Sequence, residues 1–187
     1  IHLSILLKPK CKINEVNQLS FMTSISIGDT LKKVKKNINI HYKWPNDILL
    51  NKKKIAGVII ETSSFLNKKI KWVIIGVGLN LKKSPNLKKK EFKITSLNKE
   101  KIYIERDTFI DSFLEVFFSN YEFWKKQGFN FIRKKWISNV YKKKDEIIVK
   151  YQNYYIKGKI ISLLLNGGIK LKTSKKTKDL FYGDQII

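Results

Sequence analysis

Five consecutive residues, Lys43-Trp44-Pro45-Asn46-Asp47, place a cation beside a rigid turn. Apolar residues alternate along positions 38–44, a pattern that predicts a strand with one buried face. Proline fixes φ in the turn that follows, and Asn and Asp supply local side-chain caps. The Lys43 ammonium is therefore expected to be held at a strand end, where it could bind an anion.

Small residues recur on two apolar segments after this turn. Ala56-Gly57 lies on the strand that returns from the turn, and Gly76 and Gly78 alternate on a strand predicted over residues 70–81. Missing side chains allow a ligand or another backbone to approach closely. Asn80 places an amide on the face that carries Gly76 and Gly78. A lone G-x-G is weak evidence for a nucleotide site, so a plain hairpin and a closely packed strand remain the alternatives.

Taken together, these segments resemble the biotin–protein ligase family. The ordered set is K-W-P-N-D at residues 43–47, K-I-A-G-V at 54–58 and I-G-V-G-L-N at 75–80. The opening strand, the Thr-Ser-Leu segment at 95–97, the phenylalanine-rich helix and the terminal F-Y-G-D at 181–184 also resemble that family. The resemblance covers essentially the whole chain. Lipoate–protein ligases are the nearest relatives by fold, but the two motifs favour biotin.

The sequence pattern divides into elements that would position these motifs. We expect strands at 3–7 and 70–81, a hairpin at 48–63 with its tip at 51–54, and helices at 17–34, from Asp107 or Thr108 to Gly128, and at 131–141. Further short strands are expected at 147–149, 154–156, 160–165, 169–171 and 181–182, separated by turn residues.

The fold implied by the resemblance is α+β, with helices packed on a mixed β-sheet and a small SH3-like β-barrel after it. The change of pattern places a catalytic domain at residues 1–142, expected to be N-terminally incomplete, and an SH3-like C-terminal domain at 143–187. The family's glycine- and arginine-rich loop would lie just upstream of Ile1. We therefore expect weak biotin binding and little adenylate from the chain as it stands.

Site residues are carried over from the family by position. Lys43 would be the catalytic residue, contacting the biotin carboxyl and the α-phosphate region. Gly57, Gly76, Gly78 and Leu79 would form the walls of the biotin pocket, and Asn80 would lie near the adenine or ribose of ATP.

The neighbouring residues are given structural roles. Trp44 is expected to pack under the sheet, and Asn46 and Asp47 to shape the turn. Lys54 could reach a phosphate, but with two further lysines beside it we expect a solvated hairpin tip. His2 and His41 are expected to be structural.

The implied reaction has two steps. The carboxylate of biotin attacks the α-phosphorus of Mg-ATP, giving biotinyl-5′-AMP and pyrophosphate, and a lysine of an acceptor then displaces AMP. The implied substrates are biotin and ATP with Mg²⁺, no metal ligands are expected from the protein, and the implied partner is the biotin carboxyl carrier domain of acetyl-CoA carboxylase. No winged helix-turn-helix precedes the core, so specific DNA binding is not expected, and a homodimer stays open.

The composition bounds the alternatives. The 187 residues carry a net charge of +24, but only Arg106 and Arg133 are arginines. Proteins that read nucleic acids usually also use arginine, so the lysines predict nonspecific adhesion to polyanions. The competing interpretation is an impaired remnant that acts as a basic polyanion- or carrier-binding module.

No apolar run is long enough for a membrane helix, and the single cysteine, Cys11, fits a reducing cytoplasm.

Overall fold

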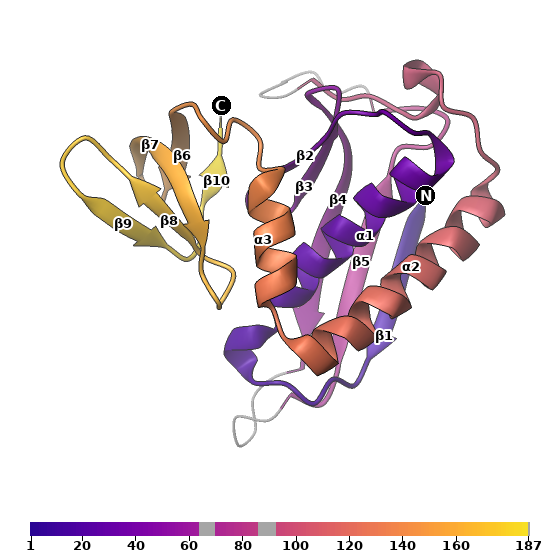
Figure 1. Cartoon of the computed structure of the whole chain (residues 1–187), viewed down its shortest axis with the longest axis horizontal. Helices are drawn as coiled ribbons and strands as arrows, with labels where there is room; N and C mark the ends of the chain where they lie inside the picture. The colour runs from indigo at the N-terminus through magenta and orange to yellow at the C-terminus, as the bar shows by residue number, and fades with distance from the viewer. Residues whose placement is uncertain (64–69, 86–92, 187) are drawn as a thin grey trace.

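The computed structural model describes residues 1–63, 70–85 and 93–186, which form two five-stranded sheets with helices beside the first (Figure 1). This confirms the expected α+β class. The first sheet has the order β1-β5-β4-β3-β2, and each of these strands pairs with its neighbour in the antiparallel sense. Its strands are β1 (His2–Leu7), β2 (Ile40–Lys43), β3 (Asp47–Leu50), β4 (Lys53–Thr62) and β5 (Val73–Leu79).

The expected hairpin is formed by β3 and β4. Its two turn residues, Asn51 and Lys52, have φ of 50° and 62°, the backbone region that two-residue hairpin turns require. The Lys43 strand is shorter than expected, because Trp44 already belongs to the turn. Lys43 is thus the last residue of β2, directly opposite Asp47 at the start of β3.

Three helices cover one face of the first sheet: α1 (Gln18–Val34), α2 (Arg106–Gln127) and α3 (Asn130–Ser138) (Figure 1). Two single-turn 3-10 helices, Ile13–Glu15 and Asn98–Glu100, lie outside this layer. Helix α1 is buried nearly all round, and its hydroxyl groups bond within the helix. Thr23 donates to the carbonyl of Leu19 at 2.7 Å and Thr30 to that of Ser26 at 2.8 Å. Such back-bonding satisfies hydroxyl groups that have no water to bond.

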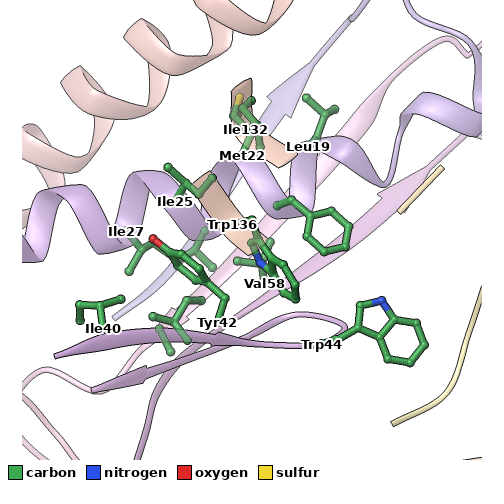
Figure 2. Packing of buried hydrophobic residues seen from close by; sticks show 14 of the residues in the cluster. Leu19, Met22, Ile25, Ile27, Ile40, Tyr42, Trp44, Val58, Ile132 and Trp136 are labelled. Carbon is green, nitrogen blue, oxygen red and sulfur yellow. The ribbon is translucent and has the colours of Figure 1, made fainter. Parts of the chain in front are cut away.

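The core lies between the helices and the sheet, as Figure 2 shows for α1. The Trp136 ring packs edge-on against Phe21, with 5.2 Å between centroids, and stacks with Tyr42 at 6.1 Å. The burial of Tyr42 raises the pKa of its hydroxyl. Helix α2 ends at Gly128 as expected. It begins at Arg106 after the N-cap Glu105, so the expected cap at Asp107 or Thr108 was wrong by two or three residues.

The second sheet has the order β10-β6-β7-β8-β9. Its strands are β6 (Ile147–Tyr151), β7 (Tyr154–Leu163), β8 (Ile169–Lys172), β9 (Thr177–Leu180) and β10 (Asp184–Gln185). Two expectations were wrong here. Strands at 154–156 and 160–165 are one continuous strand, β7, and residues 181–182 are a bend between β9 and β10. The barrel type and the domain boundary at 142/143 stay predictions. In the described part of the chain, no helix is long and apolar enough to span a bilayer.

A buried carboxylate, Glu100, fixes the segment that crosses the hairpin tip. It accepts hydrogen bonds from Thr95 at 2.6 Å, from Asn51 at 2.7 Å and from Lys53 at 2.9 Å. Burial alone would raise the pKa of Glu100, but these three donors outweigh it and lower the pKa below its usual value. The charged form is therefore the one that the fold stabilises.

The lowered pKa of Glu100 makes this anchor sensitive to acid. It stabilises the fold above the unfolded-state pKa of about 4.3 and is lost as pH falls through the folded-state value. We expect Glu100→Gln to reduce the free energy of unfolding by about 1–3 kcal/mol at pH 7 and by much less near pH 3. Urea unfolding at several pH values measures this. Glu115→Gln, whose side chain is 73% exposed, is the control; equal losses at both pH values for Glu100→Gln would contradict the prediction.

Candidate functional site

A single row of opposed residues crosses all five strands of the first sheet. The register pairs Lys43 with Asp47, Asp47 with Gly57, Gly57 with Gly78, and Gly78 with His2. Residues directly opposite one another in antiparallel strands point to the same face. The motif lysine and two of the predicted glycines thus share one face of the sheet, and this face is the one that the helices leave uncovered (Figure 1).

A cavity of about 750 Å³ lies on this face. All six predicted site residues line it: Lys43, Gly57, Gly76, Gly78, Leu79 and Asn80. The structure therefore brings these residues together, although their roles stay predictions. A volume of this size falls within the range of small-molecule sites.

The glycines on this face are not explained by the protein's own packing. A Cβ atom added to Gly78 would meet no heavy atom within 4 Å, and one added to Gly76 would lie 3.8 Å from Ile59, an ordinary contact. Neither glycine has the positive φ that favours this residue. Glycine within a strand weakens the strand. The empty space above Gly78 is therefore space that a bound molecule could fill.

Leu79 and Asn80 contribute in a more limited way than their neighbours. The Leu79 side chain is 2% exposed and packs in the hydrophobic core on the helix side. Only the main chain of Leu79 can therefore contact a molecule in the cavity. The Asn80 amide donates to the carbonyl of Thr95 at 2.9 Å. It holds the Thr95 segment beside the cavity and keeps its Oδ1 atom for other contacts.

The expectation that Lys54 lies at a solvated hairpin tip was wrong. Its ammonium lies 2.5 Å from Asp47 Oδ1, and Lys54 lines the cavity. The reason is a bulge in β4, where the register with β3 shifts. Ile55 and Ala56 are both buried in the core, so the alternation of side chains is interrupted and Lys54 turns to the cavity face.

Asp47 links the two lysines of the site. Its other oxygen, Oδ2, lies 3.5 Å from the Lys43 ammonium, and the side chains of Lys43 and Asp47 are each only 11% exposed. Besides its expected part in the turn, Asp47 thus holds both cations in place. Asn46 does shape the turn, since its amide donates to the carbonyl of Val58 at 2.9 Å.

His2, expected to be structural, also lines the cavity.

Trp44 ties the motif turn to the second sheet. Its side chain is buried, and its indole N–H donates to the carbonyl of Gly167 at 3.1 Å. Figure 2 shows the ring turned away from the side chains of α1. Beside it, Tyr42 of β2 exchanges main-chain hydrogen bonds with the chain that leads into the second sheet, at Asn139 and Tyr141. The lysine at the end of β2 is therefore positioned from both sheets.

Two cavity residues, Gln185 and Ile186, come from this second sheet. Sequence reasoning did not place them in the site, because no motif or spacing connects the end of the chain to Lys43. The pairing of β10 with β6, which brings them there, depends on the fold as a whole.

The model of the biotin/lipoate A/B protein ligase family matches residues 1–138 of the chain. The chain is 28% identical over 189 residues to the bifunctional ligase/repressor BirA of Bacillus subtilis, covering 98% of this chain and 57% of that protein. It is 32% identical over 84 residues to the biotin–[acetyl-CoA-carboxylase] ligase of Paracoccus denitrificans, covering 44% of this chain and 35% of that protein. The chain thus spans little more than half the length of the Bacillus relative.

Solved structures share the fold. The biotin protein ligase from Aquifex aeolicus in complex with biotin and ATP superposes with a TM-score of 0.80 at 24% identity, covering 98% of this chain and 76% of that one. Its apo structure gives a TM-score of 0.82 at the same identity, with 80% of that chain covered. The match extends over both sheets, because nearly the whole of this chain is covered.

The Trp44 contact predicts a loss of stability when the indole N–H alone is removed. Trp44→Phe keeps a buried aromatic ring but leaves the Gly167 carbonyl without its donor, so we expect the free energy of unfolding to fall by about 1–3 kcal/mol. Urea denaturation measures this. Trp72→Phe, at a partly buried tryptophan next to β5, serves as the matched control. Equal effects of the two substitutions would show that the Gly167 bond contributes nothing specific.

Proposed function

The chain belongs to the biotin/lipoate A/B protein ligase family, and from this premise we propose that it attaches biotin to a lysine of an acceptor protein through biotinyl-5′-AMP. The observation that carries the proposal is the row across the first sheet. It sets a cation, Lys43, at one end of a floor made by Gly57 and Gly78. Biotin is a thin, mostly apolar bicycle with a carboxylate tail, so it needs close approach to the backbone and one cation.

The choice of biotin over lipoate rests on the relatives. The family model includes ligases for both acids, whereas the Paracoccus relative is named as a biotin–[acetyl-CoA-carboxylase] ligase. One of the solved structures of the same fold contains biotin and ATP. A binding assay with both acids separates the two substrates: we expect the protein to bind biotin, and an excess of lipoate not to compete for the site.

In the first step, a carboxylate oxygen of biotin bonds to the α-phosphorus of ATP, and the bond from that phosphorus to the leaving pyrophosphate breaks. Lys43 would oppose the negative charge that develops there. Asp47 would hold Lys43 and Lys54 in position through its two oxygens. Lys54 enters the proposal because its ammonium lies on the same face as the Lys43 ammonium.

In the second step, the amine of the acceptor lysine attacks the acyl carbon, gives up a proton and displaces AMP. No covalent enzyme nucleophile is needed, so positioning and charge stabilisation are the protein's contribution. Asn80 is proposed to contact adenine or ribose through Oδ1. Among the described residues no group of three or more His, Cys, Asp or Glu could hold a metal ion. Mg²⁺ is proposed to enter as part of Mg-ATP, where it would neutralise phosphate charge.

The proposed acceptor is the biotin carboxyl carrier domain of acetyl-CoA carboxylase. Such domains tend to be acidic near their target lysine, and the net charge of +24 would speed their encounter with this chain. The name of the Paracoccus relative is consistent with this acceptor. The absence of specific DNA binding and the oligomeric state stay predictions.

Removing the Lys43 cation should affect chemistry more than folding. We expect Lys43→Ala to lower adenylate formation by about 100-fold or more, with a change in the free energy of unfolding that is small by comparison. Biotin-dependent exchange of pyrophosphate into ATP measures the first quantity and urea unfolding the second. Lys52→Ala, at the exposed turn of the same hairpin, is the control. Unchanged exchange in Lys43→Ala would refute the assigned role.

The floor of the cavity gives an independent test. Gly78→Val adds a side chain whose Cβ atom would meet no heavy atom within 4 Å, so we expect the free energy of unfolding to stay equal or to rise by up to about 1 kcal/mol. The same side chain would occupy the space proposed for biotin and should abolish its binding. Calorimetric titration with biotin checks this. Tight binding by the variant would show that the substrate lies elsewhere.

A further inference from the structure

The edge strand of the first sheet carries two polar side chains that no step of the proposed reaction uses. Strand β1 points three exposed side chains to the cavity face: His2, Ser4 and Leu6. The two polar ones lie directly opposite Gly78 and Gly76. Of the three, only these two line the cavity. The polar side chains of β1 therefore occur where the strand borders the glycines.

Exposure to solvent alone does not explain this placement. On the same face, Leu6 is 63% exposed, and Ile59, which lies opposite Gly76 on β4, is 62% exposed. The uncovered face thus carries large apolar side chains as well as polar ones. Within the described part of the chain, neither the Ser4 hydroxyl nor the His2 ring makes a hydrogen bond to the protein. Both are exposed, so a molecule in the cavity can reach them.

The two polar side chains lie across the sheet from the lysines. A Cβ atom on Gly57 would lie 3.7 Å from the Lys54 ammonium, which places this cation above β4. Strand β5, with Gly76 and Gly78, separates β4 from β1. Two strand spacings of about 4.8 Å each put roughly 10 Å between the cation and the polar side chains of β1. A molecule lying over the glycines could therefore contact both ends.

Biotin carries its polar groups in a matching arrangement. Its carboxylate stands at one end of the molecule and its ureido group, with a carbonyl and two N–H groups, at the other. With the carboxylate at the lysines and the bicycle over the glycines, the ureido group turns toward β1. A serine hydroxyl donates and accepts hydrogen bonds, and an imidazole ring can also do both. Ser4 and His2 can thus serve the carbonyl as well as the N–H groups.

We propose that Ser4 and His2 bind the ureido group of biotin and so select biotin over lipoate. Lipoate also has a carboxylate tail, but its other end is a disulfide ring without N–H or carbonyl groups. A site that hydrogen-bonds one substrate rejects the analogue that lacks those groups, because the analogue covers the polar side chains without pairing them. This inference rests on the proposed function and assigns its substrate selectivity to two residues.

The test removes each polar group in the 187-residue chain. Ser4→Ala deletes the hydroxyl, and His2→Phe keeps a flat ring without its nitrogens. We expect each to weaken the binding of biotin about 10-fold and that of desthiobiotin, which keeps the ureido group but lacks the sulfur, equally. The affinity for ATP and the unfolding temperature should not change, because both side chains are exposed. Calorimetric titrations measure the affinities. Ser174→Ala, at an exposed serine that does not line the cavity, is the matched control.

The three ligands separate the outcomes. Losses for biotin and desthiobiotin that spare ATP support the proposal. Unchanged affinity for biotin in either variant overturns the role of that residue. A loss for biotin without one for desthiobiotin also overturns the proposal, since the partner would then be the sulfur. So does an equal loss for ATP, which would show a general disturbance of the cavity. Failure of the unsubstituted chain to bind biotin would instead refute the proposed function.

Discussion

The candidate site depends on the register of five antiparallel strands. Lys43, Asp47, Gly57, Gly78 and His2 share one face only because each pair of neighbouring strands is aligned in one way. A slip of one residue would turn the glycines toward the helices and push valine or leucine side chains into the cavity. The burial of alternate β5 residues under the helices prevents that slip. The hydrophobic core thus fixes the chemistry of the opposite face.

The bulge in β4 relaxes this rule at one place. With strict alternation, Lys54 would lie on the opposite face from Gly57, away from Asp47. Because Ile55 and Ala56 are both buried, Lys54 joins the cavity face, and a Cβ atom on Gly57 would lie 3.7 Å from its ammonium. Trp44 then fixes the other end of the motif against Gly167 of the second sheet. The Asp47 carboxylate thus holds both lysines. The second sheet holds the turn that follows Lys43.

Local patterns in the sequence predicted most of the elements and six of the residues that line the cavity. Lys43 and the glycines could be placed because each follows from a strand end or an alternation within one segment. Lys54 could not, because a bulge depends on how two strands pair. The division of β7 was wrong for a similar reason: two strands were expected, at 154–156 and 160–165, and Gly158 between them lies where a Cβ atom would approach the Lys172 carbonyl to 2.5 Å. Close packing on β8, rather than a turn, explains that glycine.

Gly78 on the cavity face is a poor choice for folding alone, because it leaves an unfilled space in a strand. This observation is independent of the family match and points to the cavity, whereas the many surface lysines point to no particular site. A ligand that filled the space would make contacts there that the protein does not make for itself. Ligand binding should therefore stabilise the first sheet, to which Gly78 and its neighbours in the row belong.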